Sequence, residues 1–206
     1  MMPAARESLL DAAFAALEGR AWSAVRMVDV AAAAGVSRQT LYNEFGSKEG
    51  LARALVRREA DGYLVGVERA LTTSADARDR LTATAEWTTS AARENALVRA
   101  MLTGSWNERL PSPTLSGVPS SSVVPAQRRA DGPLPSPADF VAMVRDRAVA
   151  VITGPSAGPG AARTQSADLA RSCELAVRLA LSCVAAPPGE GGVADLVRGA
   201  LHRQPV

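Results

Sequence analysis

Apolar side chains recur every three or four residues along most of this chain, the spacing that gathers them on one face of an α-helix. Strict alternation of apolar and polar residues, which would indicate strands, is scarce. The periodic segments predict helices over about 6–17, 27–34, 38–45, 48–71, 76–93, 94–102, 137–152, 165–186 and 193–202. We therefore expect an all-α protein.

Glycine and serine mark the ends of two short helices near the N-terminus. Gly35 ends the helix over 27–34, because glycine adopts the left-handed conformation at little steric cost. Ser37 and Ser47 each precede a helix, where a hydroxyl accepts a hydrogen bond from a free backbone N–H group. Gly46 closes the helix between them. Two helices joined by a short glycine-containing turn are typical of the helix-turn-helix, whose second helix enters the DNA major groove.

The second of these helices has one apolar and one polar face. At about 100° per residue, Leu41 and Phe45 lie within about 40° of each other and define the buried side. Gln39 and Asn43 then point away from it. Amide side chains can offer a paired donor and acceptor to the edge of adenine, so this face is a candidate for reading bases.

Other polar residues surround that face and suit contacts with DNA phosphates. Thr40 and Tyr42 flank it, and Arg38 lies nearer the core. Lys48 falls in the first turn of the next helix, where its ammonium and free backbone amides can bind one phosphate together. Each of these residues alone is compatible with ordinary solvated surface. Together with the turn and the amide face they favour a DNA-binding site.

The net charge and the length of the chain bear on its partner and on its division into domains. The 206 residues carry a formal net charge of +2, so the prediction of a DNA partner depends on local geometry rather than on an overall basic field. We expect a DNA-binding domain over 1–50 and a larger helical domain over 51–206. Within the latter, 107–136 is rich in proline and serine and is predicted to be disordered, with a functional lid as the alternative. Residues 154–160, GPSAGPG, indicate a plain loop.

The stretch VDVAAAAGVSRQTLYNEFGSKEGL, residues 28–51, resembles the signature of the TetR/AcrR family of transcriptional regulators. In that signature a short helix ends in AGVS, a recognition helix contains LY and ends in F, and SKE or a similar start opens the next helix. The remainder of the chain resembles the family only in length and helical character. The resemblance implies a three-helix DNA-binding domain, followed by a divergent helical domain that binds a small molecule and forms a homodimer.

By position, the resemblance also implies a DNA-contacting set, in which Tyr42 and Lys48 touch phosphate. Its members are Arg38, Gln39, Thr40, Tyr42, Asn43 and Lys48. One departure concerns the start of the second helix, where the family often has Thr or Ser and this chain has Val25 and Arg26. Arg26 could reach a phosphate itself. A two-fold dimer would bind a palindromic double-stranded operator whose half-sites lie about 34–36 Å apart.

The larger domain offers a candidate ligand pocket and a candidate dimer surface, and ordinary core packing is the alternative in both cases. Glu86 and Arg145 could orient a polar group of a ligand. Large apolar residues that could line the pocket are Trp87, Met101, Trp106, Phe140 and Met143. Apolar residues that could form the dimer surface are Leu169, Cys173, Ala176, Leu179, Ala180, Cys183, Val193, Leu196, Val197 and Leu201.

We expect no metal ion, no cofactor and no enzymatic activity. His202 is the only histidine, which argues against a His-rich zinc site and against Ser-His-Asp chemistry. Cys173 and Cys183 are expected to be small core residues. No apolar run reaches about 18 residues, and Glu7 and Asp11 interrupt the N-terminus, so we expect a cytoplasmic protein.

The sequence thus predicts a sequence-specific DNA-binding transcriptional regulator, namely a homodimeric repressor that a small-molecule effector releases from its operator. One alternative is a helical ligand-binding or interaction protein that uses the helix-turn-helix only as a scaffold. The other is a small helical enzyme, which is disfavoured because its candidate acids, Asp76, Asp79 and Glu86, fall on a helix that looks exposed.

Overall fold

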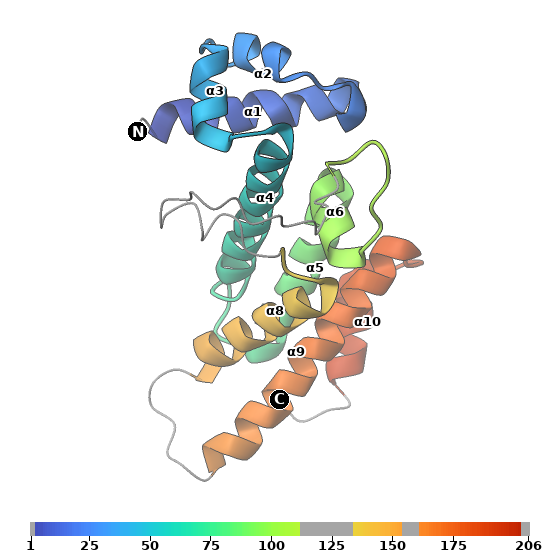
Figure 1. Ribbon diagram of the computed structural model, residues 1–206. Coiled ribbons are helices and arrows are strands. Elements are labelled where there is room, and N and C mark those ends of the chain that lie inside the picture. Colours follow the sequence, from blue (N-terminus) through green and yellow to red (C-terminus); the bar gives the residue numbers. More distant parts are fainter. Residues whose placement is uncertain (1–2, 112–133, 154–160, 203–206) are drawn as a thin grey trace. The chain divides into compact units, whose positions relative to one another are not determined.

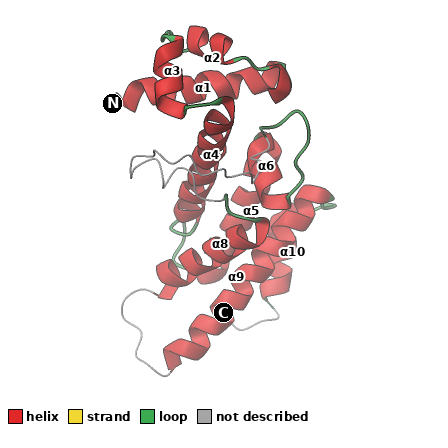
Figure 2. Cartoon of the chain, in the orientation of Figure 1, coloured by secondary structure: helices red, strands yellow, loops and turns green. Residues whose placement is uncertain are grey.

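In the computed structural model, residues 3–111, 134–153 and 161–202 are described, and all regular structure in these ranges is helical (Figures 1 and 2). The elements are α1 (Pro3–Gly19), the 3-10 turn η1 (Trp22–Ala24), α2 (Met27–Ala33), α3 (Arg38–Phe45), α4 (Lys48–Ala70), α5 (Ala77–Glu94), α6 (Ala96–Thr103), α8 (Pro137–Thr153), α9 (Ala161–Ala185) and α10 (Gly192–Leu201). The all-α prediction is confirmed. The chain divides into two compact units: the first unit is residues 1–59 with 106–134, and the second unit is residues 60–105 with 135–206.

Most helices begin and end within two residues of their predicted bounds. The exceptions are α1, which begins at Pro3 rather than near residue 6, and α9, which begins at Ala161 rather than near residue 165. Proline is tolerated at the first position of a helix, and alanine favours helix, so both helices extend beyond the apolar pattern that predicted them.

Part of the segment predicted to be disordered is folded. The backbone N–H of Trp22 donates to Arg109 O at 2.9 Å, and Asn107 Oδ1 accepts from the Arg109 N–H at 3.0 Å. These bonds hold residues 107–111 in an irregular turn of the first unit. At the other end of that segment, Ser136 Oγ accepts from the Asp139 N–H at 3.2 Å at the start of α8. Residues 112–133 and the loop predicted over 154–160 lie outside the described residues.

The core of the first unit is formed by the apolar faces of α1, α2, α3 and the start of α4. Leu9, Leu41, Leu51 and Leu55 have no exposed surface. Arg58 of α4 reinforces the packing, because its guanidinium lies 5.8 Å from the centre of the Phe14 ring and forms ion pairs with α1. Leu41, which the sequence places on the buried side of α3, belongs to this core.

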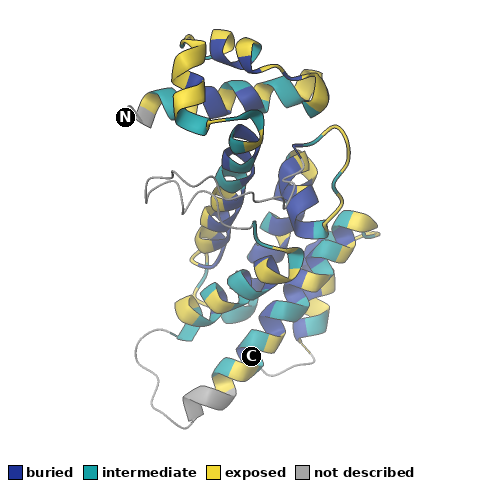
Figure 3. Ribbon diagram, in the orientation of Figure 1, coloured by how far each residue is buried: buried dark blue, intermediate teal, exposed yellow. Residues whose placement is uncertain are grey.

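In the second unit, α9 packs against α5, α8 and α10, and α6 packs against α5. Figure 3 shows buried residues on the sides of α5 and α9 that face other helices. Tyr63 and Phe140 are the largest fully buried side chains, with their rings edge to face and 6.1 Å apart. Cys173 and Cys183 are both free thiols in this core, as predicted.

Four threonines of α5 are buried in the second unit, which is unusual for a polar residue. They are Thr82, Thr84, Thr88 and Thr89. Each hydroxyl donates to the carbonyl oxygen four residues earlier in the same helix, at 2.8–2.9 Å. The Thr88 hydroxyl also bonds the buried Tyr63 hydroxyl at 3.0 Å. Burial of these hydroxyls therefore leaves none of them unpaired.

Gly66 of α4 and Trp87 of α5 meet in the second unit. A Cβ atom at position 66 would overlap the indole ring of Trp87. The same indole donates its N–H to Tyr63 O at 3.0 Å, and the Arg69 guanidinium lies 5.9 Å from the centre of its ring. The absence of a side chain at Gly66 thus makes room for the largest side chain of α5.

Candidate nucleic-acid interface

The turn between α2 and α3 has the geometry that its glycine and serine predict. Gly35 has a φ of +68°, and the Val36 N–H donates to Ala31 O at 3.0 Å, which ends α2. Ser37 then caps α3: its hydroxyl accepts from the Thr40 N–H at 3.0 Å. The predicted helix-turn-helix is present in the first unit, and its second helix is α3.

The side of α3 that faces the first unit is anchored at two places. Leu41 is the one residue of α3 that is fully buried. Arg6 of α1 donates to Glu44 Oε1 at 2.9 Å, and its guanidinium lies 5.0 Å from the centre of the half-buried Phe45 ring. Phe45 is less buried than predicted, because Arg6 rather than an apolar side chain covers its ring.

The opposite side of α3 carries the two amides predicted to read bases. Gln39 and Asn43 are both exposed, and Gln39 Nε2 donates to Asn43 Oδ1 at 2.7 Å. This bond leaves Gln39 Oε1 as an acceptor and the Asn43 amide as a donor. The amide pair therefore keeps one acceptor and one donor for an external molecule.

The residues that flank the amide pair differ in whether a neighbouring residue bonds their side chains. The Thr40 hydroxyl lies 2.9 Å from that of Ser37, so the helix cap holds it. Arg38 is exposed, and Tyr42 is 40% exposed. Neither side chain bonds or pairs with another of the residues that the structure describes, so both are available to an external partner.

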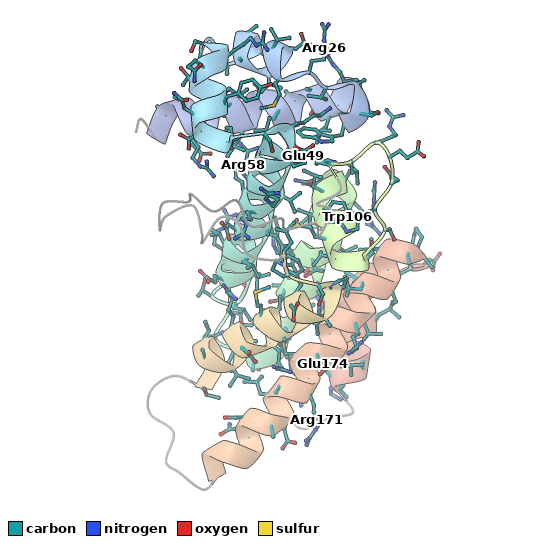
Figure 4. The ribbon with its side chains drawn as sticks, in the orientation of Figure 1. Arg26, Glu49, Arg58, Trp106, Arg171 and Glu174 are labelled. Atoms are coloured by element: carbon teal, nitrogen blue, oxygen red, sulfur yellow. The ribbon has the colours of Figure 1, made fainter. Side chains whose placement is uncertain are left out.

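Arg26 keeps an exposed guanidinium but is paired. It donates through Nε and Nη2 to the two carboxylate oxygens of Asp29, both at 3.0 Å, and Arg20 Nη1 donates to the same carboxylate at 3.2 Å. The bond from Arg26 is the main reason that the pKa of Asp29 falls and that of Arg26 rises. Arg26 stands at the N-cap of α2, and its side chain forms no capping hydrogen bond. At this end of the helix the family often has the hydroxyl of Thr or Ser. Figure 4 labels Arg26.

Lys48 begins α4 and lies against the turn η1. Its ammonium donates to Ser23 O at 3.2 Å and lies 5.4 Å from the centre of the Trp22 ring. Ser47 caps this helix, because its hydroxyl accepts from the Gly50 N–H at 3.1 Å. Sequence reasoning missed Trp22 and Ser23 as partners of Lys48. The available signal was a rare tryptophan in a short turn near the helix-turn-helix.

The five residues of the predicted ligand pocket are divided between the two units. Trp106 lies in the first unit, where it lines a cavity with Trp22 and Lys48. The other four belong to the second unit: Trp87, Met101, Phe140 and Met143. Of these, Met101 and Phe140 are core residues, at 4% and 1% exposed. Glu86 is exposed, and Arg145 pairs with its neighbour Asp146.

Most of the predicted dimer surface is core of a single chain. Eight of its ten members are buried within the second unit: Leu169, Cys173, Ala176, Ala180, Cys183, Val193, Val197 and Leu201. Leu179 is half-buried and Leu196 is 47% exposed. The apolar pattern was correct, but the packing of α9 on α5, α8 and α10 already covers it.

Among residues 3–111, 134–153 and 161–202, no three histidine, cysteine, aspartate or glutamate side chains come together as metal ligands. Likewise, no described helix combines the length and the apolar character needed to cross a bilayer.

Comparison with known proteins supports the assignment of the first unit. Residues 9–55 match the model of the family described as "Bacterial regulatory proteins, tetR family". Over 66 residues the chain is 52% identical to the HTH-type transcriptional regulator AlkX of Mycobacterium tuberculosis, covering 32% of this chain and 31% of that protein. Over 81 residues it is 41% identical to the HTH-type transcriptional activator FasR of Mycolicibacterium smegmatis, covering 39% of this chain and 37% of that protein.

Similarity beyond the first unit is one of fold. The alignments span only about a third of the length of these two relatives. A crystal structure of a TetR-family transcriptional regulator from Rhodococcus sp. aligns over 98% of both chains, with a TM-score of 0.55 and 22% identity. At that identity the match shows that the two helical folds correspond.

Proposed function

We propose that this chain, which belongs to the TetR family of bacterial regulatory proteins through its N-terminal unit, is a sequence-specific DNA-binding transcriptional regulator. The single observation that carries the proposal is the amide pair of Gln39 and Asn43 on the exposed side of α3. An amide side chain carries both a donor and an acceptor, which suits the major-groove edge of adenine, where N7 accepts and N6–H donates.

The residues around the amide pair have separate roles in this proposal. Arg38 and Tyr42 contact phosphates, since both are exposed and have no competing partner among the described residues. Arg26, Thr40 and Lys48 complete the DNA-binding set. Each of these three is already held by a neighbour, which lowers the entropy that DNA binding must remove.

The protein acts as a homodimer on a palindromic operator in this proposal. A symmetric dimer places two copies of α3 about one helical turn of DNA apart. Since most of the apolar stripe on α9 and α10 is internal, the exposed Leu196 and half-buried Leu179 are the residues left for a second copy. Light scattering on Leu196→Glu tests this: the variant should be monomeric, and a dimer would exclude this surface.

A small-molecule effector releases the dimer from DNA by favouring a conformation with lower operator affinity. Only a ligand with different affinities for the two conformations can do so, and a coupling of about 1–3 kcal/mol corresponds to about 5–150-fold release. Whether bound protein blocks or assists transcription is a separate matter, because FasR is named an activator. We propose that the bound protein represses transcription. A reporter gene downstream of the operator measures whether bound protein lowers or raises expression.

Fluorescence anisotropy with duplex DNA from upstream of the chain's own gene tests the main proposal. Wild-type protein should prefer this DNA over random duplex. Gln39→Ala combined with Asn43→Ala should remove the preference, since each well-formed base contact contributes about 1–3 kcal/mol. Lys48→Ala should weaken binding to all duplexes alike. Arg99→Ala, at an exposed arginine of α6, is the matched control and should bind as wild type does.

The alternative of a helical interaction protein that keeps the helix-turn-helix as a scaffold predicts a different result. Contacts with phosphates make the logarithm of affinity fall steeply and linearly with the logarithm of salt concentration. A flat salt dependence, with no preference in a selection from random duplexes, would support the scaffold. Membership of a family of regulatory proteins argues against the enzyme alternative.

A further inference from the structure

Rare residues gather around one cavity of the first unit. The whole sequence contains three tryptophans and a single lysine. Two of those tryptophans, Trp22 and Trp106, and that lysine, Lys48, line a cavity of about 700 Å³ whose lining residues all belong to the first unit. Small-molecule sites typically have volumes of about 300–1,000 Å³. Figure 4 labels Trp106 and Glu49 of this lining.

The two walls of the cavity are tied to each other. Trp22 and Ser23 come from the turn η1, and Trp106 begins the segment that follows α6. The hydrogen bond from the Trp22 N–H to Arg109 O joins the walls, and Asn107 folds the second wall by accepting from two backbone N–H groups. The cavity is therefore formed before any ligand binds, which reduces the entropic cost of binding.

Groups in the cavity are left with spare bonding capacity. Both indoles are half-buried, and neither indole N–H of Trp22 and Trp106 donates to another described residue. The Lys48 ammonium has three N–H donors, and its hydrogen bond to Ser23 O uses one of them. Aromatic surface that is only partly covered, next to a cation with free donors, is suited to a flat ring that carries an acidic group.

The cavity lining carries two basic and two acidic side chains. Lys48 and Arg53 are basic, and Glu49 and Glu108 are acidic. The Glu49 carboxylate accepts hydrogen bonds from its own backbone N–H and from Ser47, which lowers its pKa. The lowered pKa keeps Glu49 ionised, so the four charges of the lining balance, and the preference for an anion rests on the spare N–H donors of Lys48.

We propose that this cavity binds an aromatic carboxylate, with its ring between Trp22 and Trp106 and its carboxylate on Lys48. The ligand takes the lysine away from a DNA phosphate, so binding weakens the hold on DNA. The effect on DNA rests on the function proposed above, whereas binding of the ligand does not. This places an anion-sensitive control point in the DNA-binding unit itself.

Isothermal titration calorimetry with 2-naphthoate as the probe, and without DNA, tests the site. Wild-type protein should bind it with a Kd on the order of 0.1 mM, which suits a ligand of this size. The neutral 2-naphthamide, of the same shape, should bind about tenfold more weakly because it lacks the charge that pairs with Lys48. Absence of saturable binding up to about 5 mM, or equal affinity for acid and amide, overturns the proposal.

Three variants locate the binding site. Lys48→Met keeps the apolar stem and should lower the affinity for 2-naphthoate about tenfold, while the affinity for the amide changes less than about twofold. Trp106→Ala should weaken both probes about tenfold. Trp87→Phe, in the second unit, is the control and should bind as wild type. Circular dichroism verifies that each variant is folded, and wild-type affinity in Trp106→Ala overturns the proposed location.

Fluorescence anisotropy across a range of salt concentrations measures the effect of the bound probe on DNA affinity. Saturating 2-naphthoate should reduce the salt slope of wild-type binding by about one, as expected for one lost phosphate contact. Lys48→Met should start from the lower slope, and the probe should not reduce it further. If DNA binding is unchanged while the probe is bound, the proposal that the ligand weakens DNA binding is wrong. Protein that binds the probe but no DNA overturns the function proposed above and leaves the cavity site standing.

Discussion

Helices α3 and α5 both carry many polar residues, yet one is exposed and the other is packed into a core. In α3, Leu41 alone is fully buried, and polar side chains bond one another across the surface. In α5, eight residues are buried, including four threonines whose hydroxyls bond the helix's own carbonyls. The partner of each polar group, rather than its polarity, separates the two cases. A hydroxyl satisfied within its own helix can be buried, whereas the amide pair of α3 keeps a donor and an acceptor for an external molecule.

The largest expected effect comes from the one buried residue of α3. Leu41→Ala removes the apolar anchor and should lower the free energy of unfolding by about 2–5 kcal/mol. Asn43→Ala, two positions away on the exposed side, should change stability by less than about 0.5 kcal/mol while it reduces sequence preference. Urea denaturation followed by circular dichroism compares them. Equal costs for the two changes would contradict the division of α3 into an anchoring and a reading face.

The second prediction concerns the buried hydroxyl network around α5. Burial raises the pKa of Tyr63 from 10.0 to about 12. The folded state therefore favours the neutral phenol, and its stabilising effect is complete below pH 10 and is lost as the pH rises towards 12. Two pKa units correspond to about 3 kcal/mol. Phenylalanine does not titrate, so the Tyr63→Phe variant should lose less free energy of unfolding than wild type as the pH rises from 10 towards 12.

Denaturation at pH 9 and at pH 11.5 measures that difference. The buried Cys173 thiol also has a pKa raised by burial, to about 12, but it is present in both proteins and cancels in the comparison. Parallel loss of stability in wild type and Tyr63→Phe would show that this hydroxyl is not buried as described.

The third prediction separates two buried threonines of the same helix. Thr88→Val should destabilise the protein by about 1–3 kcal/mol, because the buried Tyr63 hydroxyl loses its partner. Thr82→Val is the matched control. The Thr82 hydroxyl bonds only the carbonyl of Arg78 in its own helix, so its removal should cost less than about 0.5 kcal/mol. Thermal denaturation that ranks the two variants in the opposite order would count against the network.

The smallest expected effect is the coupling within the amide pair. Gln39→Ala and Asn43→Ala, singly and together, form a double-mutant cycle for operator binding. Because the two side chains bond each other at 2.7 Å, their effects should be non-additive by about 0.5–1 kcal/mol. A cycle between Gln39 and Lys48, which share no bond, should be additive. Additive effects within the pair would mean that the amides act independently on DNA.

Local chemistry made the helix-turn-helix predictable. Gly35, Ser37, Gly46 and Ser47 each act within a few residues of their own position, so the sequence alone predicts their caps and turns. The ammonium of Lys48 is held instead by a carbonyl 25 residues away, a contact that no local pattern contains.

The larger domain was harder to predict for a related reason. An apolar stripe shows that a helix is covered, but it does not identify the covering element. The stripe of α9 was predicted to form a dimer surface, with core packing as the alternative, and α5, α8 and α10 cover most of it. Buried threonines gave no apolar signal, so this part of the core was missing from the prediction. Helix positions were therefore predictable, but the neighbours of each helix were not.

The lack of a side chain at Gly66 constrains how this sequence can diverge. Since a Cβ at position 66 would overlap the indole of Trp87, position 66 must stay glycine as long as this tryptophan keeps its place. A descendant that acquires a larger residue at 66 must first, or at the same time, accept a smaller one at 87. Alignments of close homologues should therefore show glycine at 66 wherever tryptophan stands at 87.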